Sequence, residues 1–432
     1  MAEAGETAAE PRERFIPVRK GEIVAALLAE PKLAEPGAGS EFRQFCKLVG
    51  AIFHYQHSEE LERLKDAYHH FNPHHAGKAD AASETAYADL LATLRRVLTR
   101  ANFIEVTADE MAKAAREQAL FEVEVRAVTD DHRDVFFFRR GRHRERVERR
   151  EWMGLKVRPL DVDVYDDVVM VATLRPEEAT AEKRPGRFRP RRRHRPGSML
   201  IKCFRDIPSA DLNTLLPDAK VIMGQRDKWM IGVPALFGGI PLLLKLGPTL
   251  AVLAILLGLR LGTGGEVAGD RLQQALIVTS GLLALGGFLT HQWVKYQRQA
   301  LRYQLEINGS LYFRNVSNNA GMFDAIIGAA EEQEFKEAVL VYFFLLGEPA
   351  SRPELDRKIE AWLATGFGIS VDFELDDGLA KLERLGILQD TGGRLSVPPL
   401  PDALRRLDRI WDDFFVFAGN DPALTEAARL RA

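Results

Sequence analysis

Cysteine is scarce in this chain of 432 residues, which contains only two, Cys46 and Cys203. They lie far apart and form no CxxC pair, so the sequence excludes a disulfide framework and a zinc ribbon. A strong charge of either sign is also lacking, because 59 Lys and Arg residues face 62 Asp and Glu residues for a net charge of -3. This balance excludes a protein whose whole surface binds nucleic acid.

Signatures of common enzyme sites are missing as well. The sequence contains no GxxxxGK[ST], no strand-linked GxGxxG, no GxSxG and no set of kinase motifs. The N-terminal stretch is acidic and polar, without the apolar run of a signal peptide or the basic pattern of a transit peptide. Any insertion into a membrane is therefore expected to depend on internal segments.

Two long apolar runs lie in the middle of the chain, at residues 230–259 and 275–293, and Lys245 is the only Lys, Arg, Asp or Glu within them. A bilayer core about 30 Å thick is crossed by about 20 apolar residues. The runs predict a two-helix transmembrane hairpin with spans at about 240–259 and 275–293. A buried helical hairpin is the alternative interpretation, although such helices usually keep a polar stripe.

Basic residues flank the outer ends of this pair more densely than the link between the runs. They are Lys220, Arg226, Lys228, Lys295, Arg298 and Arg302 outside, against Arg260 and Arg271 in the link. Because basic residues close to spans remain on the cytoplasmic side, both termini are expected there. The sequence thus predicts an integral protein of a bacterial inner membrane.

The region before the apolar runs, residues 1–219, is expected to be an α+β soluble domain. Phe42, Phe45 and Val49 follow helical spacing, and Ser58 is a candidate N-cap of a further helix that ends before Pro73. Later segments are rich in β-branched and aromatic residues and predict strands: FEVEVRAV, DVFFFRRG, VDVYDDVVMVATL and SMLIKCF.

The region after the runs, residues 303–432, predicts three helices followed by a β-hairpin. Ser351 and Glu354 form a capping box before the second helix, and Gly386 follows the third. This order is typical of a winged helix. The complete prediction is an α+β domain, a transmembrane hairpin at 220–302 and a C-terminal winged-helix-like domain.

Nucleic acid is disfavoured as a partner of this winged-helix-like domain. Its third helix, where DNA would be read, carries more acidic than basic side chains: Glu374, Asp376, Asp377 and Glu383 against Lys381 and Arg384. Phosphate contacts require the opposite sign.

Histidines cluster early in the chain, and four of them, His54, His57, His69 and His70, are candidate metal ligands. Neither HExxH nor a Cys/His finger spacing accompanies them, and His74 and His75 follow Pro73, which breaks the helical register. The acidic pairs Asp166/Asp167 and Asp376/Asp377 likewise have no evident partners. We expect no metal and no cofactor, because polar helix ends and solvated surfaces are the favoured explanation of these residues.

A basic segment at residues 183–197 is too charged and too rich in proline to pack in a core. Its arginines are candidate ligands for anionic lipid headgroups, each attracted by about 1 kcal/mol near such a surface. They are Arg184, Arg187, Arg189, Arg191, Arg192, Arg193 and Arg195. A solvated linker without a partner, or contact with nucleic acid, are the alternatives.

Three segments resemble a family of uncharacterised double-spanning membrane proteins that includes the mitochondrial transmembrane protein 143. They are RERFIPVRK near the N-terminus, HSEELERLKDAYHHFNP, and above all FRDIPSADLNTLLP at residues 204–217. The resemblance implies a membrane location and a domain of unknown function, and it supplies no catalytic residues. One departure is that His74 and His75 follow Pro73, where the family pattern has an acidic residue.

These observations favour a non-catalytic, membrane-anchored scaffold or regulatory protein that acts through an unknown protein partner and anionic lipids. The alternatives are a metal-dependent, membrane-associated enzyme using the cluster from His54 to His75, and a membrane-tethered transcription regulator. Metal analysis would separate the first from the second, and DNA binding would test the third.

Overall fold

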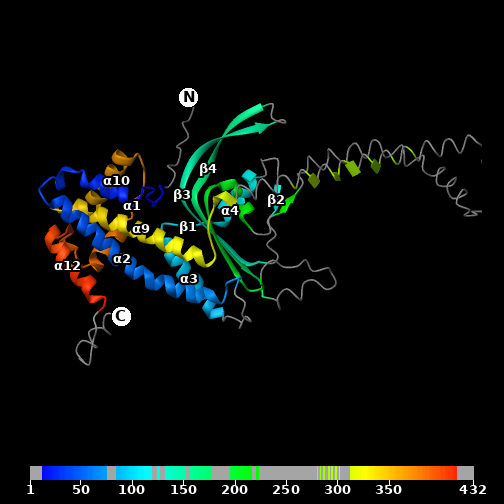
Figure 1. The fold of residues 1–432 in the computed structure, drawn as a ribbon. Coiled ribbons are helices and arrows are strands. Elements are labelled where there is room, and N and C mark those ends of the chain that lie inside the picture. Colours follow the sequence, from blue (N-terminus) through cyan, green and yellow to red (C-terminus); the bar gives the residue numbers. More distant parts are fainter. Residues whose placement is uncertain are drawn as a thin grey trace, which may run out of the picture. The chain divides into compact units, whose positions relative to one another are not determined.

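Figure 1 shows the fold of the chain in a computed structural model. The structure describes residues 12–74, 84–118, 124–126, 132–151, 156–176, 195–216, 220–222 and 312–415, together with scattered helical positions between 280 and 301. These residues belong to two compact units. The first comprises residues 1–106, 131–209 and 315–432, and the second comprises residues 107–130 and 210–314.

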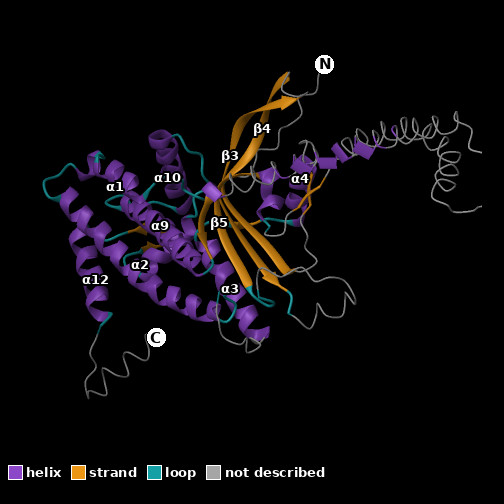
Figure 2. Ribbon diagram, turned by 45° about the vertical axis from the view of Figure 1, so that its right-hand side comes forward, coloured by secondary structure: helices purple, strands orange, loops and turns teal. Residues whose placement is uncertain are grey.

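Seven α-helices are described in the first unit, and most of them come from the two ends of the chain (Figure 2). They are α1 (Lys20–Leu28), α2 (Ala38–His69), α3 (Glu84–Arg100), α9 (Ala320–Leu345), α10 (Arg352–Phe367), α11 (Leu375–Arg384) and α12 (Leu400–Asp413). The long helices α2 and α9 pack side by side, with α12 against α2 and α11 against α9. N-terminal and C-terminal elements therefore build one helical layer.

A five-stranded antiparallel sheet completes the first unit, with the strand order β1-β3-β4-β5-β7. Its strands are β1 (Ile104–Glu105), β3 (His132–Glu151), β4 (Lys156–Leu174), β5 (Met199–Pro208) and β7 (Asn315–Asn318). The hairpin of β3 and β4 is much longer than its neighbours, since β5 pairs only with residues 164–173 of β4. Among the described strands, residues 156–163 of β4 pair only with β3.

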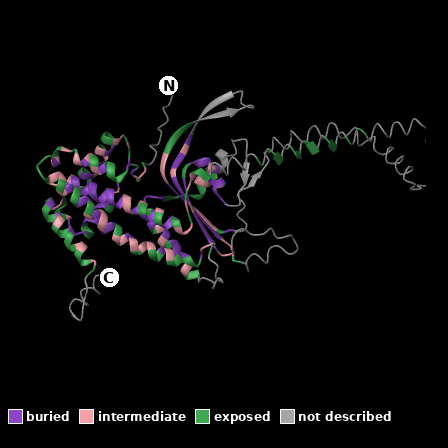
Figure 3. Ribbon diagram, in the orientation of Figure 1, coloured by how far each residue is buried: buried purple, intermediate pink, exposed green. Residues whose placement is uncertain are grey.

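Two apolar cores lie within this unit, and α2 and α9 contribute to both (Figure 3). The first core joins the early half of α2, including Phe42 and Phe53, to the late half of α9 and to helices α10 to α12. The second core joins the late half of α2 and α3 to the early half of α9, including Phe323, and to one face of the sheet. A single stretch in the middle of each long helix separates the cores.

The described residues of the second unit include helix α4 (Ala108–Gln118), most of a 3₁₀ helix (Ser209–Leu215) and two paired strands. Helix α4 begins with a reciprocal cap, in which the backbone N–H of Thr107 donates to Glu110 and the N–H of Glu110 donates to the Thr107 hydroxyl. Strand β2 (Glu124–Arg126) pairs antiparallel with β6 (Lys220–Ile222).

Most local predictions are confirmed. The four segments rich in β-branched residues overlap β2 to β5, and the C-terminal hairpin forms from β8 (Gln389–Thr391) and β9 (Arg394–Ser396). Ser351 and Glu354 make the capping box of α10, and Gly386 follows α11 with a φ of 64°. The prediction for Ser58 is wrong, because α2 continues through it and its hydroxyl donates to the carbonyl of Tyr55 within the helix.

The predicted fold class needs correction, since its transmembrane part is not upheld. The described residues form a mixed α/β fold around an antiparallel sheet, and none of their helices is both long and apolar enough to cross a bilayer. The physical reason is composition: α2 and α9 are long, but charged side chains interrupt both. The predicted span at 240–259 lies outside the described residues, as does most of that at 275–293.

The predicted location in a membrane is wrong for the same reason as the predicted transmembrane hairpin. The placement in a bacterial inner membrane with both termini cytoplasmic rested on basic residues beside two spans. Without a membrane-crossing helix in the described part of the chain, that count of flanking charges has no structural basis.

Candidate functional site

The middle of α9 is a turn of polar side chains buried between the two cores. Gln333, Glu334, Lys336 and Glu337 are each at most 3% exposed, although such residues normally lie at the surface. Burying a charged group without a partner is very costly, so each requires a neighbour. Two sets of neighbours meet this turn, one from helices α2, α3 and α11 and one from the N-terminal segment.

Glu334 is the centre of the first set. Its carboxylate lies 3.4 Å from His57 Nε2 on α2, 3.0 Å from Arg100 Nε at the end of α3 and 3.5 Å from Arg384 Nη2 on α11. Burial alone would raise the pKa of Glu334, but the hydrogen bond from His57 and the nearby cations lower it to about 2. Arg100 also pairs with Glu60 at 2.6 Å, so the network ties together three helices around α9.

Glu337, one residue beyond Lys336, has a different environment. It pairs with Lys381 of α11 and accepts a hydrogen bond of 3.3 Å from the side-chain amide of Asn102. Burial raises its pKa to about 7, and the charge of Lys381 offsets only part of that effect. The carboxyl group therefore titrates close to neutral pH, unlike Glu334.

The N-terminal segment crosses the other side of the polar turn. Lys336 Nζ donates to the carbonyls of Ile16 at 2.8 Å and Val18 at 3.1 Å, and the Gln333 amide donates to Ile16 at 3.3 Å. Burial lowers the pKa of Lys336 to about 8. Further along the segment, the backbone N–H of Lys20 donates to Glu332 at 3.0 Å. Polar contacts therefore hold residues 16–20 across α9, and we call this segment the N-terminal strap.

A cleft of about 300 Å³ opens between this strap, α9 and the sheet, and we call it the polar cleft. Its charged and amide residues are Arg19, Arg140, Asp166, Asp167, Arg205, Asp206, Glu332, Gln333 and Lys336. Four of these side chains are cationic and four are anionic. The cleft therefore suits a small polar ligand rather than a highly charged one.

Within the cleft, Asp167 holds two arginines. Arg140 donates to it through Nη2 at 2.7 Å and Nε at 2.9 Å, and Arg205 Nε lies 3.4 Å away. The guanidinium of Arg140 is sandwiched between Phe15 and Phe103, each with its ring centroid at 4.5 Å. Arg140 is thus fixed, whereas the Arg205 side chain is 60% exposed and keeps its terminal nitrogens available at the rim.

The sheet is irregular at the rim of this cleft. Asp166 of β4 lies between Gly141 of β3 and Asp206 of β5, and these three residues interrupt the regular strand pairing. Gly141 and Asp206 have positive φ angles of 68° and 54°. A non-glycine residue in this region carries a strain of roughly 1–3 kcal/mol, and such residues cluster at functional sites. The irregularity presents Asp166 to His143, whose Nδ1 lies 2.8 Å from its carboxylate.

The carboxyl group of Asp166 is electrostatically unusual. Burial raises its pKa, and the neighbouring carboxylates of Asp167 and Asp206 raise it further, while His143 opposes them. This carboxyl group therefore keeps its proton to a higher pH than an ordinary aspartate does.

The structure separates the predicted metal ligands. His54 pairs with Glu331 at 2.9 Å, His57 belongs to the Glu334 network, and the rings of His69 and His70 stack edge-on at 6.0 Å. In the described part of the chain, no three His, Cys, Asp or Glu side chains are arranged to hold a metal ion. Most of the basic segment lies outside the described residues, but Arg195 is described and donates to the carbonyl of His70 at 2.7 Å.

Of the acidic pairs singled out in the sequence, Asp166/Asp167 lies in the polar cleft, whereas Asp376/Asp377 lies on α11, where Asp376 pairs with Arg352 at the surface. The sequence did not identify Arg140, Arg205 or the polar turn of α9 as candidate site residues. The available signal was the FRDIP segment, which was noted for its resemblance and contains Arg205 and Asp206.

A domain of the family described as protein of unknown function DUF3754 is found at residues 165–321. The matched stretch runs from β4 to the start of α9, covers less than half of the chain and includes the cleft residues Asp166, Asp167, Arg205 and Asp206. No solved structure matches this chain.

Proposed function

We propose that this protein is a non-catalytic regulatory or scaffold protein whose polar cleft binds a small ligand carrying a carboxylate or phosphate together with a hydrogen-bond donor. The observation that carries the proposal is Arg205, whose side chain is 60% exposed at the rim and contacts Asp167 through Nε, at 3.4 Å. The carboxylates of Asp166 and Asp206 also line the cleft and can accept hydrogen bonds from a ligand.

Charge and size support the same ligand class. Arg205 stands exposed at the rim and can bind an anionic group through its terminal nitrogens, as arginine does with carboxylates and phosphates. A volume of about 300 Å³ lies at the lower end of ligand pockets and suits a molecule of amino-acid size. Because the strap forms one wall of the cleft, an occupied cleft would change the contacts that tie the N-terminus to α9.

We expect an Arg205→Gln variant to lose ligand affinity while it keeps its fold. A hydrogen bond to a charged group is worth roughly 1.5–3 kcal/mol, or about ten- to a hundredfold in affinity. Asp167 keeps Arg140 as its partner, so the substitution leaves no buried charge unpaired. Calorimetric titration with free amino acids and with phosphoethanolamine, which carry a carboxylate or phosphate together with an ammonium donor, would measure the loss.

The matched control is Arg144→Gln. Arg144 is another exposed arginine of the same sheet and pairs with Asp163 at 3.5 Å, and neither residue lines the cleft. It should bind as the wild type does. Equal affinity of the two variants for a ligand that binds the wild type, or no binding by any probe, would contradict the proposal.

Contact with anionic lipid surfaces through the basic segment is a second proposal, supported by its composition. We expect the full chain to sediment with anionic vesicles at low salt but not with neutral ones. Replacing the seven arginines from Arg184 to Arg195 by glutamine should abolish sedimentation with anionic vesicles. Unchanged sedimentation would refute this contact.

The relation to the family that includes the mitochondrial transmembrane protein 143 likewise stays a proposal, supported by the three segments quoted above.

A further inference from the structure

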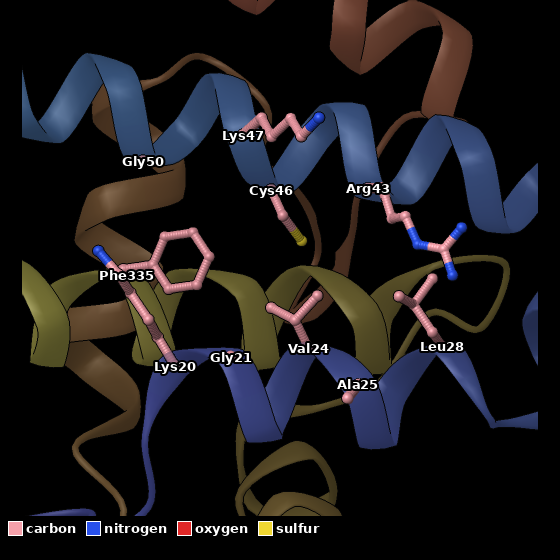
Figure 4. A pocket seen from close by; sticks show the side chains of 10 residues that line it. All are labelled: Lys20, Gly21, Val24, Ala25, Leu28, Arg43, Cys46, Lys47, Gly50 and Phe335. Carbon is pink, nitrogen blue, oxygen red and sulfur yellow. The ribbon is translucent and has the colours of Figure 1, made fainter.

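A second hollow, which we call the α1–α2 groove, lies on the helical layer and has a different chemistry (Figure 4). Its volume is about 630 Å³, and it is lined by α1, α2 and Phe335 of α9. The polar cleft shares none of its lining residues, so the two sites can be considered separately.

Small residues create this groove. Gly21 and Ala25 face it from α1, Gly50 and Cys46 face it from α2, and the Cys46 thiol points into the space between the helices. A Cβ placed on Gly21 would meet no atom within 4 Å, which shows how much room the helices leave there. Burial raises the pKa of Cys46 to about 12, so at neutral pH its side chain acts as an uncharged, apolar part of the wall.

The rim of the groove is cationic. Lys20, Arg43 and Lys47 line it, and none of the ten described lining residues is acidic. Lys20 is neutralised by Glu331 at 3.3 Å, but Arg43 and Lys47 make no ion pair with any described residue. Figure 4 shows Arg43 reaching from α2 towards Leu28 at one end of the groove. Unpaired cations beside an apolar floor match a ligand with an anionic head and an apolar tail.

We propose that the α1–α2 groove binds a free fatty acid, with its acyl chain along Val24, Leu28 and Phe335 and its carboxylate at Arg43 and Lys47. The volume lies within the range of pockets that enclose an organic ligand of this size. Each CH₂ group moved from water to an apolar wall tightens binding up to about fourfold. The proposal does not rest on the function of the polar cleft.

Two probes with the same chain and opposite heads test the charge. The full chain should bind dodecanoate saturably below its micellar concentration, and dodecyltrimethylammonium at least about tenfold more weakly. Binding should also tighten with chain length from eight carbons and level off once the groove is filled. Equal affinity for both heads would overturn the proposal, and so would binding to anionic vesicles without any binding of monomeric dodecanoate.

Filling the groove tests the location. Gly21→Leu should weaken dodecanoate binding by about tenfold or more, because leucine replaces the volume that the chain would occupy. The control is Gly366→Leu on α10, where an added Cβ also meets no atom within 4 Å and which lines neither the α1–α2 groove nor the polar cleft. Wild-type affinity in Gly21→Leu would overturn the proposal.

A second variant keeps the test decisive if Gly21→Leu fails to fold. Arg43→Gln/Lys47→Gln changes only exposed side chains and should lower dodecanoate affinity roughly five- to tenfold, as expected for two exposed ion pairs. Alkylation of the two buried cysteines gives an internal reference: dodecanoate should slow modification of Cys46 and leave that of Cys203 unchanged. Unchanged affinity in the double variant, or equal protection of both cysteines, would overturn the proposal.

Discussion

A Lys381→Met variant is expected to be about 3 kcal/mol less stable than the wild type at pH 8, and to lose much less at pH 5. Lys381 is 6% exposed and is the cationic partner of Glu337, which is 2% exposed. Methionine has a similar length, so the main change is the loss of the charge. At high pH the Glu337 carboxylate would then be buried with only the Asn102 amide as a donor among the described residues.

The dependence on pH follows from the raised pKa of Glu337. This group has a folded pKa of about 7 against 4.5 for an unperturbed glutamate, so its protonated form contributes stability that is complete below about 4.5 and lost as pH rises through about 7. In the wild type the charge of Lys381 lowers the pKa of Glu337, so removing Lys381 raises that pKa further. The loss of stability in the variant should therefore grow between pH 5 and pH 8.

Urea unfolding followed by far-UV circular dichroism at both pH values would measure this effect. Lys358→Met is the matched control, since Lys358 pairs with Glu348 at 3.1 Å but both side chains are about half exposed. That pair should be worth about 0.2–1 kcal/mol at either pH. In Glu337→Gln/Lys381→Met the growth with pH should disappear. A cost in the single variant that is the same at pH 5 and pH 8 would show that Glu337 does not titrate in this range.

Features whose signals lie within a few residues could be predicted from the sequence. The capping box at Ser351 and Glu354, the glycine after α11 and the turn between β8 and β9 each depend on local hydrogen bonds or on one backbone angle. Ser58 shows where such signals end. It has the residue type of an N-cap, but the apolar face of α2 continues on both sides, and packing against α9 carries the helix through it.

The candidate site could not be predicted in the same way, because its parts are remote in sequence. The polar turn of α9 resembles an exposed helical surface, and its burial depends on His57, Arg100 and Lys381 from three other helices. The polar cleft likewise needs the N-terminal strap and β5 to meet beside Asp167. The apolar runs show the converse, since composition alone predicted membrane spans that no described helix provides.

Gly141→Ala is expected to destabilise the protein by about 3 kcal/mol, the sum of a strained backbone and an overlap in the sheet. With a φ of 68°, Gly141 lies in a region that favours glycine. An added Cβ would approach the Asp166 Cγ at 2.5 Å and Cβ at 2.7 Å, and a rotamer change cannot move that Cβ. The backbone of β3 or β4 must shift, so we also expect loss of the contact between Asp166 and His143 and weaker ligand binding in the polar cleft.

Gly197→Ala separates the two contributions to this loss. Gly197 has a φ of 75°, but a Cβ there meets no atom within 4 Å, so the control should lose only the backbone part, about 1 kcal/mol. Adding Asp166→Gly to Gly141→Ala removes the overlapping Cβ and should recover part of the stability relative to Asp166→Gly alone. Urea unfolding of the four variants would measure these differences. If Gly141→Ala costs no more than Gly197→Ala, the close approach of Asp166 to Gly141 does not constrain the fold, and the irregular row at the rim of the cleft tolerates a side chain.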